Sequence, residues 1–129
     1  LANSNRPIAF TYRGRRDVDI GPLDDSTISD GFGVRYFDGN VFRLLTATDT
    51  TQFHSFAVTI DGSGVQLFHD GQFIDSNGAV PRSTNEGSGL GRRVGSNAPF
   101  FDGVLDDFRI YNKVLSAAEV SDIDANIIP

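Results

Sequence analysis

Cysteine, methionine and tryptophan are all absent from the 129 residues of this chain. Without cysteine there are no disulfides and no thiolate metal sites, so stability has to come from packed apolar side chains. Because methionine is absent, we expect Leu1 to be a processing site or the edge of a fragment rather than the translation start. The lack of tryptophan weakens, without excluding, a sugar ligand, because carbohydrate modules built on β-sandwiches usually present tryptophan or tyrosine to the sugar.

The chain also lacks long apolar runs and an excess of positive charge. No apolar run approaches the length of a membrane span or a signal peptide. Lysine and arginine together number 11 against 17 aspartates and glutamates, which gives a net charge of -6. Because phosphate binding requires a basic field, we predict no nucleic-acid partner. Because no apolar run is long enough, we predict no membrane insertion.

Short segments of alternating polarity dominate what remains, together with 11 phenylalanines and 14 glycines. Such segments, separated by turn residues, are typical of an all-β sandwich, and the length of the chain indicates one domain over residues 1–129. We expect strands at 8–12, 18–20, 32–37, 41–47, 53–60, 65–69, 72–75, 90–94 and 104–111. A helix should follow, because Ser116 and Glu119 have the spacing of a capping box.

The turn between the sixth and seventh expected strands has a strong signal. Asp70-Gly71 favours a two-residue hairpin loop, since both central residues of a type I′ turn need positive φ. This loop predicts Phe68 opposite Phe73 and Leu67 opposite Ile74.

A three-residue loop at Asp38-Gly39-Asn40 fits the hydrophobic pattern of the earlier hairpin better than a two-residue loop. It places Tyr36 opposite Phe42 and Arg35 opposite Arg43. We expect the two arginines to lie on a wet face, where carboxylates from a neighbouring strand could meet them.

Three stretches of the sequence carry a family resemblance. Residues 104–119 read as a strand that runs into a Leu-Ser-Ala-Ala-Glu helix start, residues 53–62 as a Phe-His strand ending in Asp-Gly, and residues 65–71 as a hairpin strand ending in Asp-Gly. They resemble the laminin-G-like (concanavalin A-like) jelly-roll domains. Two departures are Phe53, where the family usually has tryptophan, and His69, where it usually has an apolar residue.

The resemblance implies an all-β fold, an antiparallel jelly-roll β-sandwich with a short C-terminal helix. It covers residues 53–123 well and the first 50 residues loosely. We therefore expect a single domain that is a segment of a longer polypeptide, with the opening strands absent or unrecognisable.

Catalysis is not expected. Glycoside hydrolysis generally needs two carboxylates about 5 to 9.5 Å apart. Glu86 and Glu119 are the only glutamates, and the first lies in a loop while the second belongs to the capping box. We expect His54 to be a half-buried, hydrogen-bonded structural residue rather than a base, and His69 to be exposed beside its turn.

Metal binding is a second possibility, since the resemblance implies Ca²⁺ at the rim of the sandwich, held by aspartate and carbonyl oxygens. Our candidate ligands are Asp24, Asp25, Asp61 and Asp102. The competing interpretation is that these side chains cap turns through local hydrogen bonds. Asp106 differs, because its strand parity points it inward, and we expect Arg92 or Arg93 to pair with it.

A third possibility is a ligand surface around the aromatic and basic residues Tyr12, Arg13, Arg15 and Arg16. This strip could contact a sugar or an acidic partner, although a solvated face also explains it.

The resemblance implies a non-catalytic recognition or adhesion module, with a carbohydrate or protein ligand, in a larger extracellular, cell-surface or virion-associated protein. The alternative is a structural or assembly subunit that packs on copies of itself or on flanking domains of its parent chain. Its motive is the 104–111 strand: the closing strand of this family pairs with the opening one, so this strand should be left as an open edge.

Overall fold

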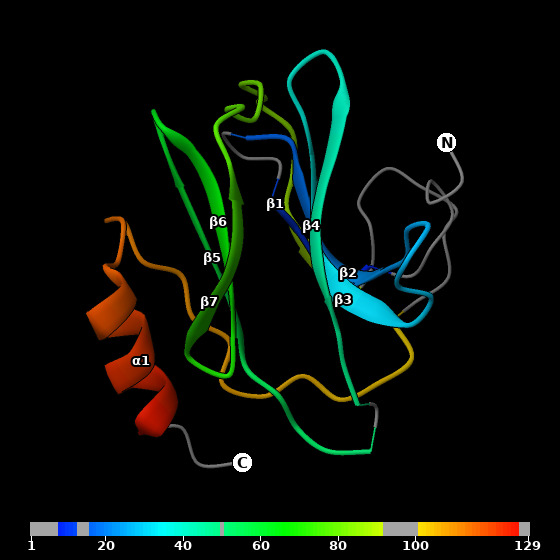
Figure 1. The fold of residues 1–129 in the computed structure, drawn as a ribbon. Coiled ribbons are helices and arrows are strands. Elements are labelled where there is room, and N and C mark those ends of the chain that lie inside the picture. The colour runs from blue at the N-terminus through cyan, green and yellow to red at the C-terminus, as the bar shows by residue number, and fades with distance from the viewer. Residues whose placement is uncertain (1–7, 13–15, 50, 92–100, 127–129) are drawn as a thin grey trace.

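The computed structural model describes residues 8–12, 16–49, 51–91 and 101–126. In these residues the chain forms two facing antiparallel sheets, and a short helix lies on the side of the smaller sheet that faces away from the larger one (Figure 1). This is the antiparallel β-sandwich with a C-terminal helix that the sequence predicts.

The larger sheet has the strand order β4-β3-β2-β1-β8 in the described part of the chain. Its strands are β1 (Phe10–Tyr12), β2 (Val18–Leu23), β3 (Gly31–Phe37), β4 (Val41–Ala47) and β8 (Gly89–Leu90). The smaller sheet has the order β5-β6-β7, with β5 (Phe56–Asp61), β6 (Gly64–His69) and β7 (Gln72–Asn77). The helix α1 spans Ala117–Ala125.

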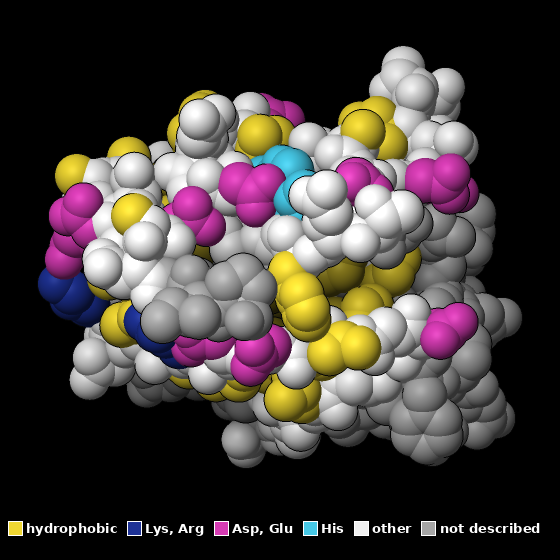
Figure 2. Space-filling view, turned by 90° about the horizontal axis from the view of Figure 1, so that it is seen from below, with side chains coloured by type: hydrophobic (Ala, Val, Ile, Leu, Met, Phe, Trp, Pro, Cys, Tyr) yellow, Lys and Arg dark blue, Asp and Glu magenta, His cyan; other side chains and the backbone are white. Residues whose placement is uncertain are grey.

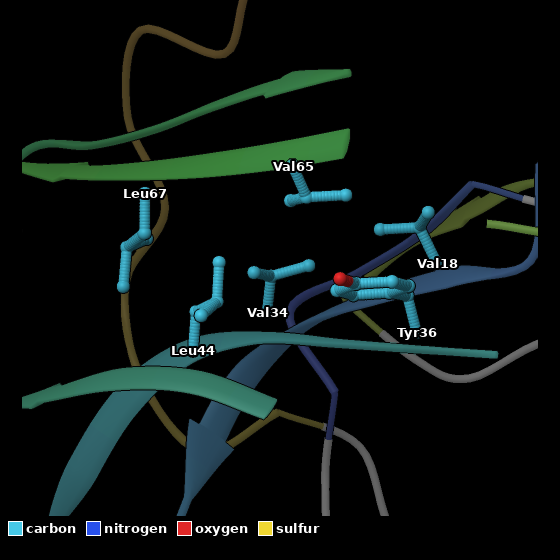
Figure 3. Close-up of a cluster of buried hydrophobic side chains, with 6 residues drawn as sticks. All are labelled: Val18, Val34, Tyr36, Leu44, Val65 and Leu67. Atoms are coloured by element: carbon cyan, nitrogen blue, oxygen red, sulfur yellow. The ribbon is translucent and has the colours of Figure 1, made fainter. Parts of the chain in front are cut away.

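The core lies between the two sheets. Alternate residues of a strand point to one face, and the inward sets of both sheets are mostly apolar, with Thr46 and His69 as polar members. Figure 3 shows six of these side chains pointing toward one another: Val18, Val34, Tyr36, Leu44, Val65 and Leu67. Packed apolar and aromatic groups therefore supply the stability that disulfides cannot.

The β3–β4 hairpin has the predicted register. Tyr36 pairs with Phe42 and Arg35 with Arg43, and Gly39 carries the positive φ of the three-residue loop, at 113°. The two aromatic rings of this hairpin stack with centroids 5.2 Å apart.

The face that carries Arg35 is not wet, which corrects the sequence-based expectation. The Arg35 side chain is only 7% exposed, and its Nη2 lies 2.7 Å from Oδ2 of Asp19, which is 3% exposed. Asp19 stands directly opposite Arg35 on the neighbouring strand β2. It is therefore a carboxylate from a neighbouring strand, of the kind expected to meet this arginine.

The β6–β7 hairpin has one of its two predicted cross-strand pairs. Phe68 pairs with Phe73, but Leu67 pairs with Asp75 rather than with Ile74. A bulge at Ile74 causes this shift, and bulges are commonest on edge strands such as β7, where only one side has a ladder to disturb.

The expected strand at 104–111 is absent, which is the largest correction to the sequence-based fold. The described residues from 101 to 115 form no ladder, and Asp107 has φ of 52°, which interrupts an extended run. Asp106 is exposed rather than inward, and its Oδ1 accepts a hydrogen bond from the backbone N–H of Asp107. The proposed partners Arg92 and Arg93, and most of the expected 90–94 strand, lie outside the described residues.

Candidate functional site

The ligand surface predicted at the end of β1 has two described residues, Tyr12 and Arg16, and these do not form one exposed surface. Tyr12 packs against the core cluster and lies 6.2 Å from the ring of Phe10. The Arg16 guanidinium instead donates a hydrogen bond to the carbonyl of Pro81 at 3.0 Å. Arg13 and Arg15 lie outside the described residues, so ligand binding by this strip stays a prediction.

Two of the four aspartates proposed as calcium ligands, Asp25 and Asp61, accept hydrogen bonds in separate turns. Asp25 Oδ1 accepts hydrogen bonds from the backbone N–H groups of Thr27 and Ile28, and these bonds hold the pKa of Asp25 below its usual value. Asp61 Oδ1 likewise accepts from the Ser63 N–H. Asp24 is half-buried and Asp102 exposed.

These four carboxylates do not gather in one place. In Figure 1 the turn after β5, where Asp61 lies, is at the far end of the sandwich from the loop between β2 and β3. The group of three possible metal ligands within the described residues is a different one. Calcium binding stays a prediction.

That group is His54, His69 and Asp70, at the end of the smaller sheet where β6 turns into β7. The pairing of β5 with β6 sets Phe56 opposite His69. The turn that follows has positive φ at Asp70 (49°) and Gly71 (79°), as the Asp-Gly signal predicts. Backbone hydrogen bonds then hold the turn against the residue before β5: Asp70 N–H donates to the Ser55 carbonyl at 2.9 Å.

The two imidazole rings converge on the carboxylate of Asp70. Its Oδ2 lies 2.7 Å from Nδ1 of His54 and 3.3 Å from Nε2 of His69. One ligand atom from each residue can be chosen so that all of them lie within 4.8 Å of one another. His54 is thus a half-buried, hydrogen-bonded residue, as expected.

His69 is not exposed, contrary to the sequence-based expectation. Its side chain is 17% exposed, because its ring stacks on Phe56 with centroids 4.8 Å apart and planes 19° from parallel. The Nε2 atoms of both histidines are buried and have no hydrogen-bond partner among the described residues.

Asp70 is held in its charged form. Partial burial would raise the pKa of its carboxyl, but the hydrogen bond with His54, the Ser55 backbone N–H and the nearby imidazoles outweigh that effect and lower it. A second carboxylate stands close by, because the Ser55 hydroxyl donates to Oδ1 of Asp124 on helix α1. Figure 2 shows the histidine side chains at this end of the molecule, beside acidic side chains and next to a group of hydrophobic ones.

Sequence reasoning examined both histidines singly and missed the cluster. A signal was available: the short turn between Asp61 and Gly64 fixes the β5–β6 register. Extending that register backwards from the Phe56–His69 pair brings His54 to the Asp70-Gly71 turn.

A second surface feature is the exposed strip, by which we mean the apolar side chains between β8 and α1. Val104 is 73% exposed and Ile110 is 65% exposed. The strip consists of Val104, Leu105, Phe108, Ile110, Tyr111 and Val114. The middle of the strip is anchored, because the Phe108 ring lies 4.8 Å from Phe10 of β1 in an edge-to-face contact.

The glutamates do not form a catalytic pair in the arrangement described. Glu119 Oε1 accepts from the Ser116 N–H at 3.0 Å, the Glu119 N–H donates to the Ser116 hydroxyl at 3.2 Å, and Lys113 Nζ lies 2.7 Å from Oε2. The capping box is therefore confirmed. Glu86 is exposed on a segment without strand structure.

The fold and its motifs define a laminin-G-like sandwich domain. The family model described as the concanavalin A-like lectin/glucanases superfamily matches residues 8–121, and the chain belongs to this family. Its domains are commonly ligand-binding modules and often extracellular. No curated protein and no solved structure shows a significant match. None of the helical structure in the described residues has the length and hydropathy needed to cross a membrane.

Proposed function

We propose that this chain is a non-catalytic recognition module of a larger extracellular, cell-surface or virion-associated protein, and that its ligand is a protein segment bound along the exposed strip. Six large apolar side chains on a short stretch of backbone make a surface that favours burial against another polypeptide. This exposed strip is the observation that carries the proposal.

The sequence of the strip explains how a protein ligand would bind. Val104, Phe108 and Ile110 share one parity, while Leu105 and Tyr111 share the other. A stretch with apolar residues on both parities is suited to a strand covered on both faces, yet no neighbouring strand pairs with it in the described structure. A segment of another chain, or of the parent protein, would supply that neighbour by strand addition, for which the chain would have to straighten at Asp107.

A sugar ligand has less support. Sugar-binding surfaces combine an exposed aromatic face with free hydrogen-bonding groups. Two polar side chains beside the strip are already engaged with each other, because Arg109 forms two hydrogen bonds with Asp107, at 2.6 and 2.9 Å. Catalysis also lacks support, because Glu119 is used by the helix cap.

A second candidate is assembly, in which the ligand is another copy of this chain. The same strip favours it, because an apolar surface with an unpaired backbone can accept a strand from an identical molecule.

One set of measurements separates these functions. Light scattering across a range of protein concentrations reports self-association, and a glycan panel with and without calcium reports sugar binding. Replacing Ile110 with lysine should abolish any self-association, whereas Leu90→Lys, an exposed apolar residue outside the strip, should leave it unchanged.

If the domain is monomeric, hydrogen exchange tests the parent protein as the ligand. The amides of residues 104–111 should exchange fast in the isolated domain and become protected in the longer polypeptide. Equal exchange in both, or glycan binding that Ile110→Lys and Tyr111→Ala leave intact, would contradict the proposal.

A further inference from the structure

We infer that His54, His69 and Asp70 form a binding site for a divalent transition-metal ion of the zinc class. The site is separate from the exposed strip and from the aspartates considered for calcium. The inference rests on the convergence of three ligand groups and on a buried ring nitrogen of His69 that makes no hydrogen bond.

The convergence is fixed by the backbone rather than by chance side-chain rotation. His69 is the last residue of β6 and Asp70 the first of the turn. His54 is tied to the same turn because its neighbour Ser55 exchanges two hydrogen bonds with Asp70: the Ser55 N–H donates to Oδ1 at 3.0 Å, and its carbonyl accepts from the Asp70 N–H at 2.9 Å. The stack on Phe56 sets the orientation of the His69 ring.

A buried ring nitrogen that makes no hydrogen bond points to a ligand. Buried polar atoms nearly always have a hydrogen-bond partner, and each exception calls for an explanation. The Nε2 atoms of both histidines are such exceptions within the described structure. A cation bound by the Asp70 carboxylate, His54 Nδ1 and His69 Nε2 would use the lone pair of the His69 nitrogen, which lies 3.3 Å from Asp70 Oδ2 without a hydrogen bond.

The donor set selects the class of ion. Two imidazoles with one carboxylate suit zinc and its neighbours, and three protein ligands leave a fourth position for water. Calcium and magnesium prefer sets composed of oxygen atoms, so they should bind here weakly or not at all.

The geometry requires a modest adjustment. Ligand atoms in a tetrahedral zinc site stand roughly 3.3 Å apart, while the present atoms lie within 4.8 Å of one another. The ion would bind Nδ1 of His54 in place of the proton shared with Asp70, and that proton would move to Nε2 of the same ring. The Asp70 side chain is 45% exposed, so the ion has a path from solvent (Figure 2).

Neighbouring groups support the ligand carboxylate. The Ser55 N–H holds the second oxygen of Asp70 in place, and hydrogen bonds of this kind orient metal ligands. Asp124 adds negative charge next to the turn: a Cβ atom placed on Gly71 would lie 3.0 Å from its Oδ2.

The experiment is a titration of the chelator-treated protein with Zn²⁺, followed by calorimetry and by NMR of the histidine ring nitrogens. Because the chain has only 2 histidines, both sets of ring resonances can be assigned and should shift together on addition of one ion per chain. Ca²⁺ and Mg²⁺ at the same concentration should leave them unchanged.

Variants locate the site. His69→Phe keeps the stack on Phe56 and removes one ligand, and Asp70→Asn keeps the left-handed turn and removes the charge; each should weaken Zn²⁺ binding at least tenfold. Asp61→Asn, in the turn after β5, is the matched control and should bind as the parent does. The NMR result does not depend on the variants folding. Failure of either histidine to shift, or affinity unchanged in both ligand variants, would overturn the inference.

Discussion

Arg35 and Asp19 are charged residues from which folding removes nearly all contact with water. Their side chains are 7% and 3% exposed and meet at 2.7 Å. Removing two charges from water is costly, and their mutual attraction offsets that cost only while both partners are present. The pair therefore makes the structure sensitive to loss of either member.

We predict that Asp19→Leu or Arg35→Met alone lowers the free energy of unfolding by about 3 to 5 kcal/mol, because each leaves the other charge of the pair buried without its partner. The double variant Asp19→Leu with Arg35→Met should recover most of this loss. Urea denaturation of the four proteins provides the measurement. A double variant as unstable as the sum of the single ones would show that the two residues are not energetically coupled.

Single residues also show the limit of sequence reasoning. The β3–β4 register placed Arg35 correctly, but a two-fold strand period cannot say whether the outer face of a sheet is covered. For His69 the strand period was informative, because His69 shares its parity with the buried Val65 and Leu67, and its place beside the turn misled the prediction.

At the scale of elements, helix α1 depends on its cap. The side chain of Glu119 accepts hydrogen bonds from Lys113 and from the Ser116 N–H, and these lower its pKa below the usual 4.5. A carboxylate whose pKa is depressed by folding stabilises the native state above its unfolded pKa, and this contribution is lost as pH falls through the folded pKa.

We predict that Glu119→Gln, which keeps an acceptor for the capping box, lowers the melting temperature at neutral pH. The difference from the parent should shrink as the pH falls below 4.5 and vanish once Glu119 itself is protonated. Thermal melting followed by circular dichroism over this range gives the comparison. A difference that persists in acid would assign the effect to shape rather than charge.

Elements defined by local signals were predictable, and elements that depend on a distant neighbour were not. The loops at 38–40 and 70–71 and the helix start at Ser116 follow from turn and capping residues. The expected strand at 104–111 failed because alternation alone does not supply a partner, and Asp107 adopts a left-handed conformation. The bulge at Ile74 had no signal in the sequence.

At the scale of the molecule, one core joins the two sheets. Leu44 belongs to the larger sheet and Leu67 to the smaller, and both are fully buried in the same cluster (Figure 3). Layers that share a single core should unfold together.

We predict that Leu44→Ala and Leu67→Ala each lower the free energy of unfolding by about 2 to 5 kcal/mol, through lost packing and the cavity that remains. Both should move one and the same transition, whether it is followed by the far-ultraviolet signal or by the near-ultraviolet signal of the tyrosines. The exposed bulge residue Ile74 serves as the control, since Ile74→Ala should cost little. Two separate transitions would mean that the sheets are independent units.

The contact between helix α1 and the rest of the domain has a mechanical consequence. In the described structure α1 belongs to no sheet ladder, and the Ser55–Asp124 hydrogen bond is one of the side-chain contacts that hold it. A pulling force applied beyond α1 would load these contacts one after another, whereas the strands resist through many backbone bonds at once. Under tension the helix would peel away at low force and lengthen the tether, while the sandwich stayed intact.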